Sequence, residues 1–487
     1  MSQTPADTSQ VVGVASSGAS SSGVGAGAEA AAVSASAPAS PSSAPPDGAR
    51  WRRRITVFLL GQTVTLLGSM LVQYAVLWYV TLRTQSGMVM ALTTVFAFVP
   101  QAVVSVFGGV WADRLNRKWL INGADAVIAA TTLALALLMA SGVDSLWLIY
   151  LTLAIRSAGA GVQLPAVYAL LPQIVPEDRL MRINGINGGI QSGMMLVAPA
   201  LAGAIFAASS IVPILFIDVI TAAIGITLVA IVPVRRVARA GERAGDQPPA
   251  YFADLREGVR YAASEPLVRW VLAVFAVVML LAAAPSTLTP LLVVRTFGDE
   301  VWKLTVNELA FSAGMLLGGA AIAVFAARAN RVLLVFGAAG AVSVATIVMG
   351  LPIGMWAFFA LMLVGGFAVA FLSTPIFTLL QERVPAERQG RVFGLLGIAM
   401  ALAMPIGMAV FGPLADVWSV QSLLIVGGAL MLGWSVLTLA LPSGRRAIAA
   451  GRPPEAVVEG PVSAKAVAGA APGTGSPAEP GGAAAGR

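Results

Sequence analysis

Long apolar stretches, separated by short polar connections, fill the chain between residues 55 and 441. Each stretch is near or above the roughly 20 residues that an α-helix needs to cross a hydrocarbon core about 30 Å thick. The first six stretches are 55–82, 88–111, 119–141, 146–170, 183–208 and 211–232. Six more are 270–294, 304–327, 332–350, 353–380, 392–415 and 417–441. The pattern predicts an all-α polytopic membrane protein with twelve transmembrane helices.

The longest polar connection divides these twelve stretches into six and six. It covers residues 233–269 and separates an N-terminal six-helix bundle, 51–232, from a C-terminal six-helix bundle, 270–441. Its second part places apolar residues at helical spacing between charged ones. These residues are Phe252, Leu255, Val259 and Ala262. We therefore expect an interfacial helix on the cytosolic face.

Both ends of the chain differ sharply from the apolar centre. Residues 1–50 and 442–487 consist mainly of Ser, Ala, Gly and Pro. Such segments bury too little apolar surface to offset the entropy lost on ordering. We expect two disordered cytosolic tails.

Composition and charge narrow the possible functions. The chain is 57% hydrophobic and 11% charged, which excludes an ordinary soluble enzyme, and it has no Cys or His, which excludes disulfides, thiolate metal sites and histidine catalysis. If the N-terminus is cytosolic, 26 of the 30 Lys and Arg residues fall in cytosolic segments. The positive-inside rule then predicts a multi-pass protein of the cell membrane with both termini cytosolic. It also explains the net charge of +7 without nucleic acid.

An internal repeat supports the division into two halves. The segment VPEDRLMRING, 175–185, aligns with VPAERQGRVFG, 384–394, at an offset of 209 residues. Both segments join the fourth span to the fifth within their own half. A repeat of this kind is typical of transporters built from two related bundles.

The sharpest motif is GGVWADRLNRK, 108–118, directly after the second span. Gly109 would let helices approach closely, and Asp113 is a carboxylate at the membrane boundary. Arg114, Arg117 and Lys118 supply cations that can pair with this carboxylate or with lipid headgroups. A generic basic loop would explain the cations but not the spacing of Gly and Asp. We interpret the motif as a latch between bundles that closes in one state and opens in another.

This motif resembles the signature of the major facilitator superfamily of secondary transporters, G-x-x-x-D-R-x-x-R-K between spans two and three. Asn116 stands where that family usually has Gly, and Asn tolerates the left-handed conformation well. The segment LAIRSAGAGVQ, 153–163, resembles the fourth-span Arg motif of drug/proton antiporters. The segment GMMLVAPALAG, 193–203, resembles their fifth-span signature. Its Gly193, Pro199 and Gly203 imply a helix at the bundle interface, although ordinary small-residue packing would also explain them.

A finer resemblance is to the efflux subgroup that includes macrolide exporters and enterobactin exporters. It is carried by LPQIVPEDRLMRIN at 171–184, FID at 216–218 and LREGVRYAASEPLVRW at 255–270. The resemblance implies a secondary active exporter of a hydrophobic or amphipathic small molecule, such as an antibiotic or siderophore. It further implies proton antiport and alternating access in the major facilitator fold. We expect no enzymatic activity, cofactor or metal, and a monomer in the lipid bilayer.

A few charged residues lie within the spans. Arg156 is about ten residues into the fourth span, and a charge at that depth marks a functional site by default. Asp125, Asp218 and Glu308 are membrane acids and therefore candidate proton carriers. Asp125 or Asp218 could instead simply hold Arg156 in place. We favour Asp125 with Arg156 as the coupling pair.

Polar and aromatic residues on the spans could line a cavity between the bundles. The candidates are Gln62, Gln73, Tyr74, Trp78, Gln163, Tyr168, Gln191 and Thr287. A lipid or lysolipid flippase, or a transport-inactive sensor, would show the same membrane pattern. A flippase should depend little on protons, whereas an antiporter should lose coupling when Asp125 is neutralised.

Overall fold

The chain folds into helices that follow the apolar stretches closely. The structure is a computed structural model that describes residues 50–234, 251–325, 330–442 and 444–446. The first bundle contains α1 (Arg50–Thr84), α2 (Gly87–Arg114), α3 (Arg117–Ala140), α4 (Leu146–Ile174), α5 (Leu180–Ala208) and α6 (Ile211–Ile231). After α7 (Tyr251–Ser264) come α8 (Pro266–Leu281), α9 (Ala283–Phe297), α10 (Val301–Phe325), α11 (Arg331–Met349), α12 (Met355–Arg383), α13 (Ala386–Val417) and α14 (Val420–Ala440).

The predicted fold of twelve membrane helices is confirmed. Eleven spans within the described residues are long and apolar enough to cross a membrane, and α8 and α9 together form one of them, Pro266–Phe297. The twelfth is α4, which has 29 residues but falls outside this set. Arg156 and Gln163 lie in its centre and lower its mean hydropathy.

The seventh span is broken, which the apolar pattern did not predict. Helix α8 ends at Leu281, and α9 starts at Ala283. Pro285 lies in the first turn of α9, where it has no N–H to donate to the carbonyl of Leu281. Its ring would also clash with that carbonyl in a continuous helix. The proline therefore explains the interruption at Ala282.

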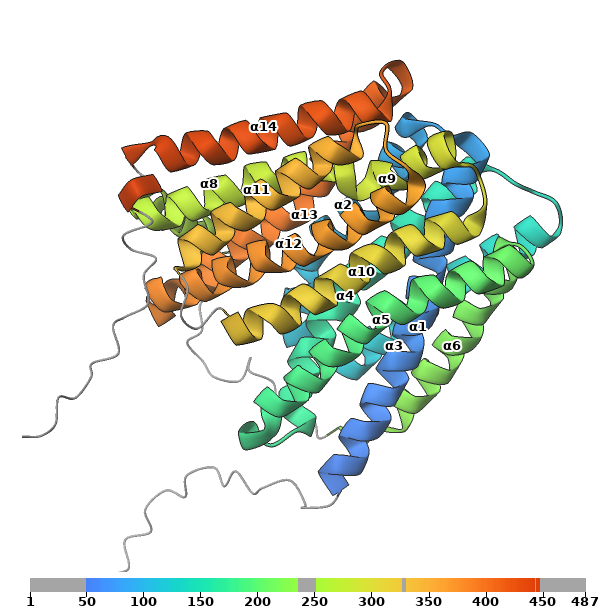
Figure 1. The fold of residues 1–487 in the computed structure, drawn as a ribbon. Coiled ribbons are helices and arrows are strands. Elements are labelled where there is room, and N and C mark those ends of the chain that lie inside the picture. Colours follow the sequence, from blue (N-terminus) through green and yellow to red (C-terminus); the bar gives the residue numbers. More distant parts are fainter. Residues whose placement is uncertain (1–49, 235–250, 326–329, 443, 447–487) are drawn as a thin grey trace, which may run out of the picture. The chain divides into compact units, whose positions relative to one another are not determined.

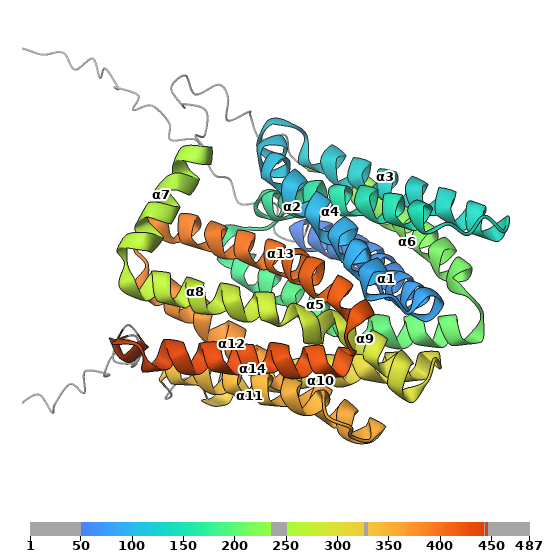
Figure 2. The ribbon, with the colours of Figure 1, turned by 90° about the horizontal axis from the view of Figure 1, so that it is seen from above.

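Helix packing repeats between the two halves. In the first half, α2 packs on α4, and α3 packs on both α4 and α6. In the second half, α10 packs on α12, and α11 packs on both α12 and α14. Each helix pair in the first half therefore has a counterpart six spans later in the second half. The two groups are visible in Figure 1, and the second group lies along one side of the view in Figure 2.

The two repeated segments share the hydrogen bond that ends the preceding helix. The Val175 N–H caps α4 by donating to the Leu171 carbonyl at 3.1 Å, and the Val384 N–H caps α12 by donating to the Leu380 carbonyl at 3.0 Å. The 3-10 turn η1 (Glu177–Arg179) follows the first of these caps.

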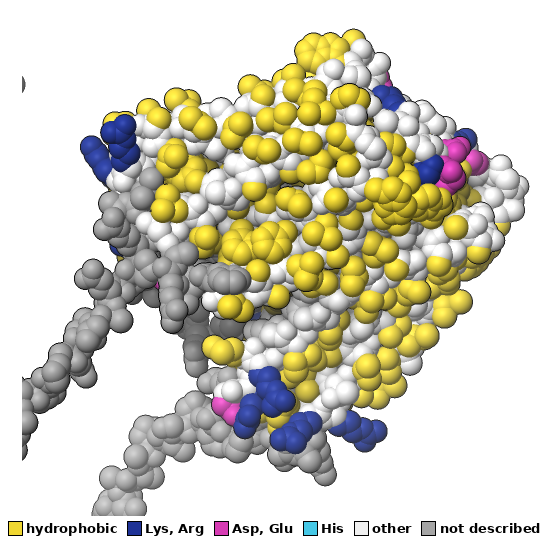
Figure 3. All heavy atoms as spheres, viewed as in Figure 1, with side chains coloured by type: hydrophobic (Ala, Val, Ile, Leu, Met, Phe, Trp, Pro, Cys, Tyr) yellow, Lys and Arg dark blue, Asp and Glu magenta, His cyan; other side chains and the backbone are white. Residues whose placement is uncertain are grey.

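Charged residues gather at the two ends of the helices, and apolar side chains cover the middle of the face shown in Figure 3. We call the end that holds the α2–α3 loop the predicted cytosolic end and the opposite end the predicted outer end, after the charge bias. The two expected tails and the first part of the connection between the bundles fall on residues 1–49, 447–487 and 235–250, which lie outside the described residues. The interfacial helix corresponds to α7, which packs on α8 and α13.

Among the described residues, the most extensive contacts between the bundles are α2 against α13 and α5 against α10, and we call these two contacts the seams. Both are tight at the predicted outer end. A Cβ atom added at Gly412 of α13 would lie 2.7 Å from the Gly87 carbonyl oxygen of α2, and one added at Gly203 of α5 would overlap Thr305 of α10. Close backbone approach of this kind requires glycine.

The same seams are open toward the predicted cytosolic end. Among the described residues, no atom beyond the local helix lies within 4 Å of a Cβ added at Gly109 of α2, Gly193 of α5 or Gly394 of α13. Met181, near the start of α5, is 88% exposed. The bundles therefore meet at one end and are separated at the other.

Candidate transport site

A charged cluster is buried inside the first bundle, where α3, α4 and α6 meet. The Arg156 guanidinium of α4 forms an ion pair with Asp218 of α6, and the same nitrogen donates to the Thr132 hydroxyl of α3. The Arg156 side chain is 10% exposed and Asp218 is 1% exposed. Gly68 of α1 makes room for this cluster, because a Cβ atom there would lie 3.0 Å from an Asp218 oxygen.

Asp125 of α3 forms a second buried interaction. Its Oδ1 accepts a hydrogen bond from Gln163 Nε2 of α4 at 2.6 Å. Within the described residues, its Oδ2 has no hydrogen-bond partner. The residue is 1% exposed. A buried oxygen without a hydrogen-bond partner is energetically costly.

The ion-pair partner of Arg156 in the structure is Asp218 and not Asp125. Helices α3 and α4 are antiparallel neighbours, and their register sets Thr132 opposite Arg156 and Asp125 opposite Gln163. The two layers are seven residues apart on each helix, or about 10 Å at 1.5 Å per residue. Arg156 consequently takes Asp218 as its ion-pair partner. The alternative that Asp218 holds Arg156 describes this contact correctly.

The α2–α3 motif binds its own bundle through two cations. Arg117 Nη1 donates to the Ala169 carbonyl of α4 at 2.7 Å. Lys118 Nζ donates to the Val232 carbonyl after α6 at 2.8 Å. Arg114 is exposed, and the side chain of Asp113 lies outside the described residues. The motif thus joins three helix ends of one bundle.

Gly108, and not Gly109 as expected, permits a close approach between helices. Gly109 has open space on its side-chain face, whereas a Cβ atom at Gly108 would lie 2.5 Å from the Gly161 carbonyl of α4. Successive helical residues point about 100° apart, so only one of the two glycines can face α4. Gly108 permits the close approach of α2 and α4.

A second copy of the motif was missed in the sequence. ADRLNRK, 112–118, is matched by AARANRV, 326–332, in the second half, where Ala replaces Asp113. Asn116 caps α3 by accepting from the Lys118 N–H, and Asn330 caps α11 by accepting from the Val332 N–H. The pattern R-x-N-R would have revealed this pair.

Of the fifth-span residues, Gly203 lies at the α5–α10 seam and Pro199 is buried within α5. Gly193 lies toward the open end. Helix α5 also packs on α1. The contact of α5 with the other bundle agrees with its expected place at the bundle interface.

The expected cavity residues divide into separate environments. Gln73, Gln191 and Tyr168 are exposed, while Tyr74 and Gln62 are half-buried. Trp78 is fully buried in the apolar core and cannot line an open cavity in this state. Gln163 is bound to Asp125, and the Thr287 hydroxyl contacts Met408 of α13.

Glu308 lies on α10 in the other bundle and is half-buried. Asn307, beside it, is fully buried. Glu308 and the Arg156 cluster therefore lie in different six-helix bundles.

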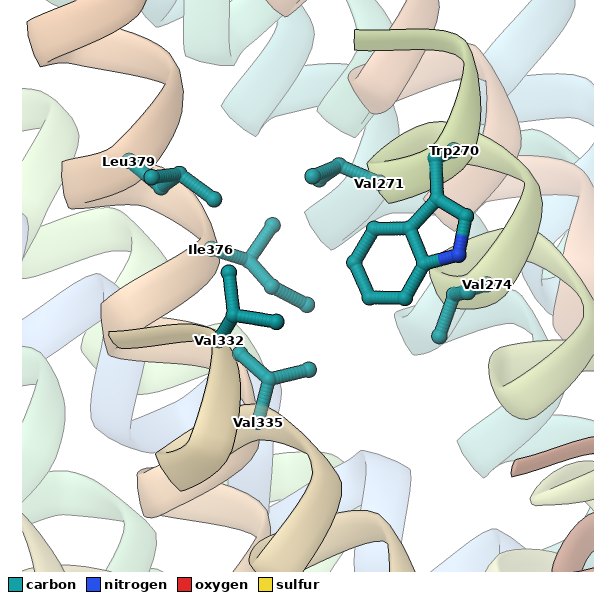
Figure 4. A pocket seen from close by; sticks show the side chains of 7 residues that line it. All are labelled: Trp270, Val271, Val274, Val332, Val335, Ile376 and Leu379. Carbon is teal, nitrogen blue, oxygen red and sulfur yellow. The ribbon is translucent and has the colours of Figure 1, made fainter. Parts of the chain in front are cut away.

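Two hollows in the described part of the structure lie away from these residues. One is an apolar hollow between α8, α11 and α12, lined by Trp270, Val271, Val274, Val332, Val335, Ile376 and Leu379 (Figure 4), and it has no space for a water molecule. Another, of about 300 Å³, includes Thr296 and Gln421. No group of residues that could hold a metal ion occurs in the described part of the chain.

Comparison with known proteins agrees with the fold. The chain is 30% identical over 384 residues to macrolide efflux protein A of Streptococcus pyogenes, covering 78% of this chain and 94% of the relative. It is 23% identical over 395 residues to the multidrug efflux pump Tap of Mycobacterium bovis, covering 79% and 92%.

Solved structures share the arrangement of helices. The nucleoside transporter NupG (D323A mutant) matches with a TM-score of 0.61 at 13% identity, over 80% of this chain and 99% of that one. A bacterial homologue of the lysosomal transporter Spinster, in an inward-facing and unoccupied conformation, matches with a TM-score of 0.58 at 15% identity, over 84% and 100%. The Major Facilitator Superfamily model matches residues 55–408 and 302–472. The chain belongs to the major facilitator superfamily.

Proposed function

We propose that this transporter exports a hydrophobic or amphipathic small molecule by proton antiport. An antibiotic, a siderophore or a compound of similar character would fit this class. Export is supported by the relatives named as macrolide and multidrug efflux proteins. Coupling to protons is supported by the residues inside the first bundle.

The observation that carries the proposal is the two-layer buried cluster. Arg156 and Asp218 neutralise each other, whereas Asp125 has only the neutral amide of Gln163 as a hydrogen-bond partner. A buried carboxyl group without a paired cation can change its protonation without breaking an ion pair. We assign the proton to Asp125 and a supporting role to the Arg156–Asp218 pair.

Alternating access is supported by the asymmetry of the seams. Both seams close through glycine contacts at the predicted outer end and open toward the predicted cytosolic end. This arrangement corresponds to a state that takes its substrate from the cytosol. Export then requires a second state in which the predicted outer end is open and the predicted cytosolic end is closed.

Proton movement in everted membrane vesicles tests the proposal. The vesicles are energised to be acid inside, and macrolides, siderophores, dyes and lysolipids are added separately. We expect one compound to release protons with the wild-type protein and not with Asp125→Asn. Asp144→Asn is the matched control, because Asp144 is an exposed acid that pairs with Arg83 within the same bundle.

The opposite result is also informative. If labelled drug or lipid redistributes while no compound moves protons, proton antiport is wrong. A flippase or facilitated diffusion would then take its place.

A further inference from the structure

The predicted outer end is closed by a carboxylate from one bundle that caps a helix of the other. Asp416 is near the C-terminal end of α13, and α2 begins at Gly87 beside it. Asp416 Oδ1 accepts from the Gly87 N–H at 2.7 Å, and Oδ2 accepts from the Met88 N–H at 2.9 Å. The Ser86 hydroxyl donates to Oδ2 at 2.8 Å.

These bonds complete the start of α2. The first N–H groups of a helix have no partner within the helix. Here the first two are bound by Asp416, the third donates to Ser86 Oγ at 3.4 Å, and the fourth donates to the Ser86 carbonyl. A carboxylate is unfavourable at the C-terminal end of its own helix and favourable at the N-terminal end of another. Electrostatics therefore favour this contact between the bundles.

Arg295 of α9 binds at the same contact between α13 and the start of α2. Its Nη1 donates to the Ala415 carbonyl at 2.7 Å, and its Nη2 lies 3.3 Å from Asp416 Oδ1. Nη2 also donates to the carbonyl of Gln85, the one residue other than glycine with a positive φ in the described chain. One cation thus ties the strained α1–α2 turn to the end of α13.

The sequence segment that ends in Asp416 occurs twice in the chain. G-x-x-A-D occurs at 109–113, at the end of α2, and at 412–416, at the end of α13. The two helices are packed against each other with opposite directions. Asp416 therefore lies beside the start of α2 at the predicted outer end, whereas residue 113 is at the opposite end of α2, where the seam is open.

We infer that Asp416 and Arg295 form an outer latch that must break whenever the transporter opens outward. The inference rests on the proposed alternating access. Opening would move Asp416 away from α2 and leave the Gly87 and Met88 amides to water. The strength of the latch sets the equilibrium between the inward-open state and the outward-open state, whichever compound is carried.

A single introduced cysteine can report the opening of the predicted outer end, because the chain has no cysteine of its own. Met408 of α13 is fully buried in this state. We introduce Met408→Cys and treat right-side-out vesicles with a membrane-impermeant maleimide. Asp416→Asn should be labelled about tenfold faster than the parent, because the lost charge weakens bonds to two amides and a guanidinium.

Asp144→Asn is the control, because Asp144 lies at the same end and pairs with Arg83 inside one bundle. It should leave the labelling rate unchanged. A second variant, Gly87→Ala, should also speed labelling, because its Cβ would lie 2.6 Å from that of Ala415. The latch is wrong if neither Asp416→Asn nor Gly87→Ala is labelled faster, or if Asp144→Asn is labelled as fast as Asp416→Asn.

Labelling needs neither substrate nor a proton gradient. If Asp416→Asn speeds labelling while no compound moves protons in the vesicle assay, the latch stands and the proposed proton antiport fails. If protons move but labelling is unchanged in both seam variants, the latch fails and antiport stands.

Discussion

Gln163 Nε2 donates to Asp125 Oδ1 at 2.6 Å, and this neutral contact distinguishes Asp125 from the ion-paired Asp218. An amide can bind a carboxylate, and after rotation its oxygen can accept from a carboxylic acid. The partner of Asp125 thus suits both protonation states. Such a residue can lose or gain a proton while its surroundings stay in place.

Asp125→Asn should therefore uncouple transport from protons. We expect substrate-driven proton release to fall about a hundredfold or more, because positioned acid–base groups typically contribute about 10²–10⁴-fold. Pyranine or acridine fluorescence in everted vesicles measures it. Gln163→Leu should reduce the rate less than Asp125→Asn does, and equal rates in Asp125→Asn and wild type would remove Asp125 from the mechanism.

Arg156→Ala should abolish transport and lower stability while membrane insertion is retained. The change leaves Asp218 buried without its cation, and breaking a buried pair costs about 3–5 kcal/mol. Thermal unfolding in detergent measures this loss. The double variant Arg156→Met/Asp218→Leu should recover most of the stability and none of the transport. Equal stability of the single variant and the wild type would contradict a structural pair.

Gly108→Ala and Gly109→Ala should differ, although the two glycines are neighbours. The added methyl at Gly108 meets the Gly161 carbonyl, whereas the one at Gly109 meets open space. Overpacking at a helix contact costs about 1–3 kcal/mol, so only Gly108→Ala should lower the unfolding temperature. The reverse order would show that α2 is rotated relative to α4.

Asp113→Asn should abolish transport and leave insertion and thermal stability intact. The expectation follows from its place in the first G-x-x-A-D segment, at the opposite end of the α2–α13 seam from Asp416. Efflux of the compound identified in vesicles, measured with purified protein in liposomes, checks it. Asp178→Asn is the matched control, since Asp178 is an exposed acid paired with Arg179 in another loop at that end. Normal efflux by Asp113→Asn would exclude the latch role.

The apolar pattern predicted the helices well because each span must satisfy its backbone hydrogen bonds internally over a fixed thickness. Predicted and observed boundaries of α3 differ by two residues or fewer. The break at Ala282 was not predicted, because its cause is one proline within an otherwise continuous apolar run.

The partners of charged residues were harder to predict. Asp125 and Asp218 were both within reach of Arg156 by depth alone, and only the register of α3 on α4 separates them. Gly87 and Asp416 are 329 positions apart in the chain, and their contact depends on how the two bundles meet. The signal for Asp416 was nevertheless present, as the second G-x-x-A-D.

The low hydropathy of α4 has a consequence for biosynthesis. A single Arg at the centre of a span costs about 2.5–3.5 kcal/mol on translocon-insertion scales, and its compensating Asp218 is synthesised two helices later. Helix α4 therefore enters the bilayer stably only after the ribosome has produced α6. The insertion machinery must shelter α4 until then, and a nascent chain arrested before α6 should leave α4 exposed to the quality-control proteases of the membrane.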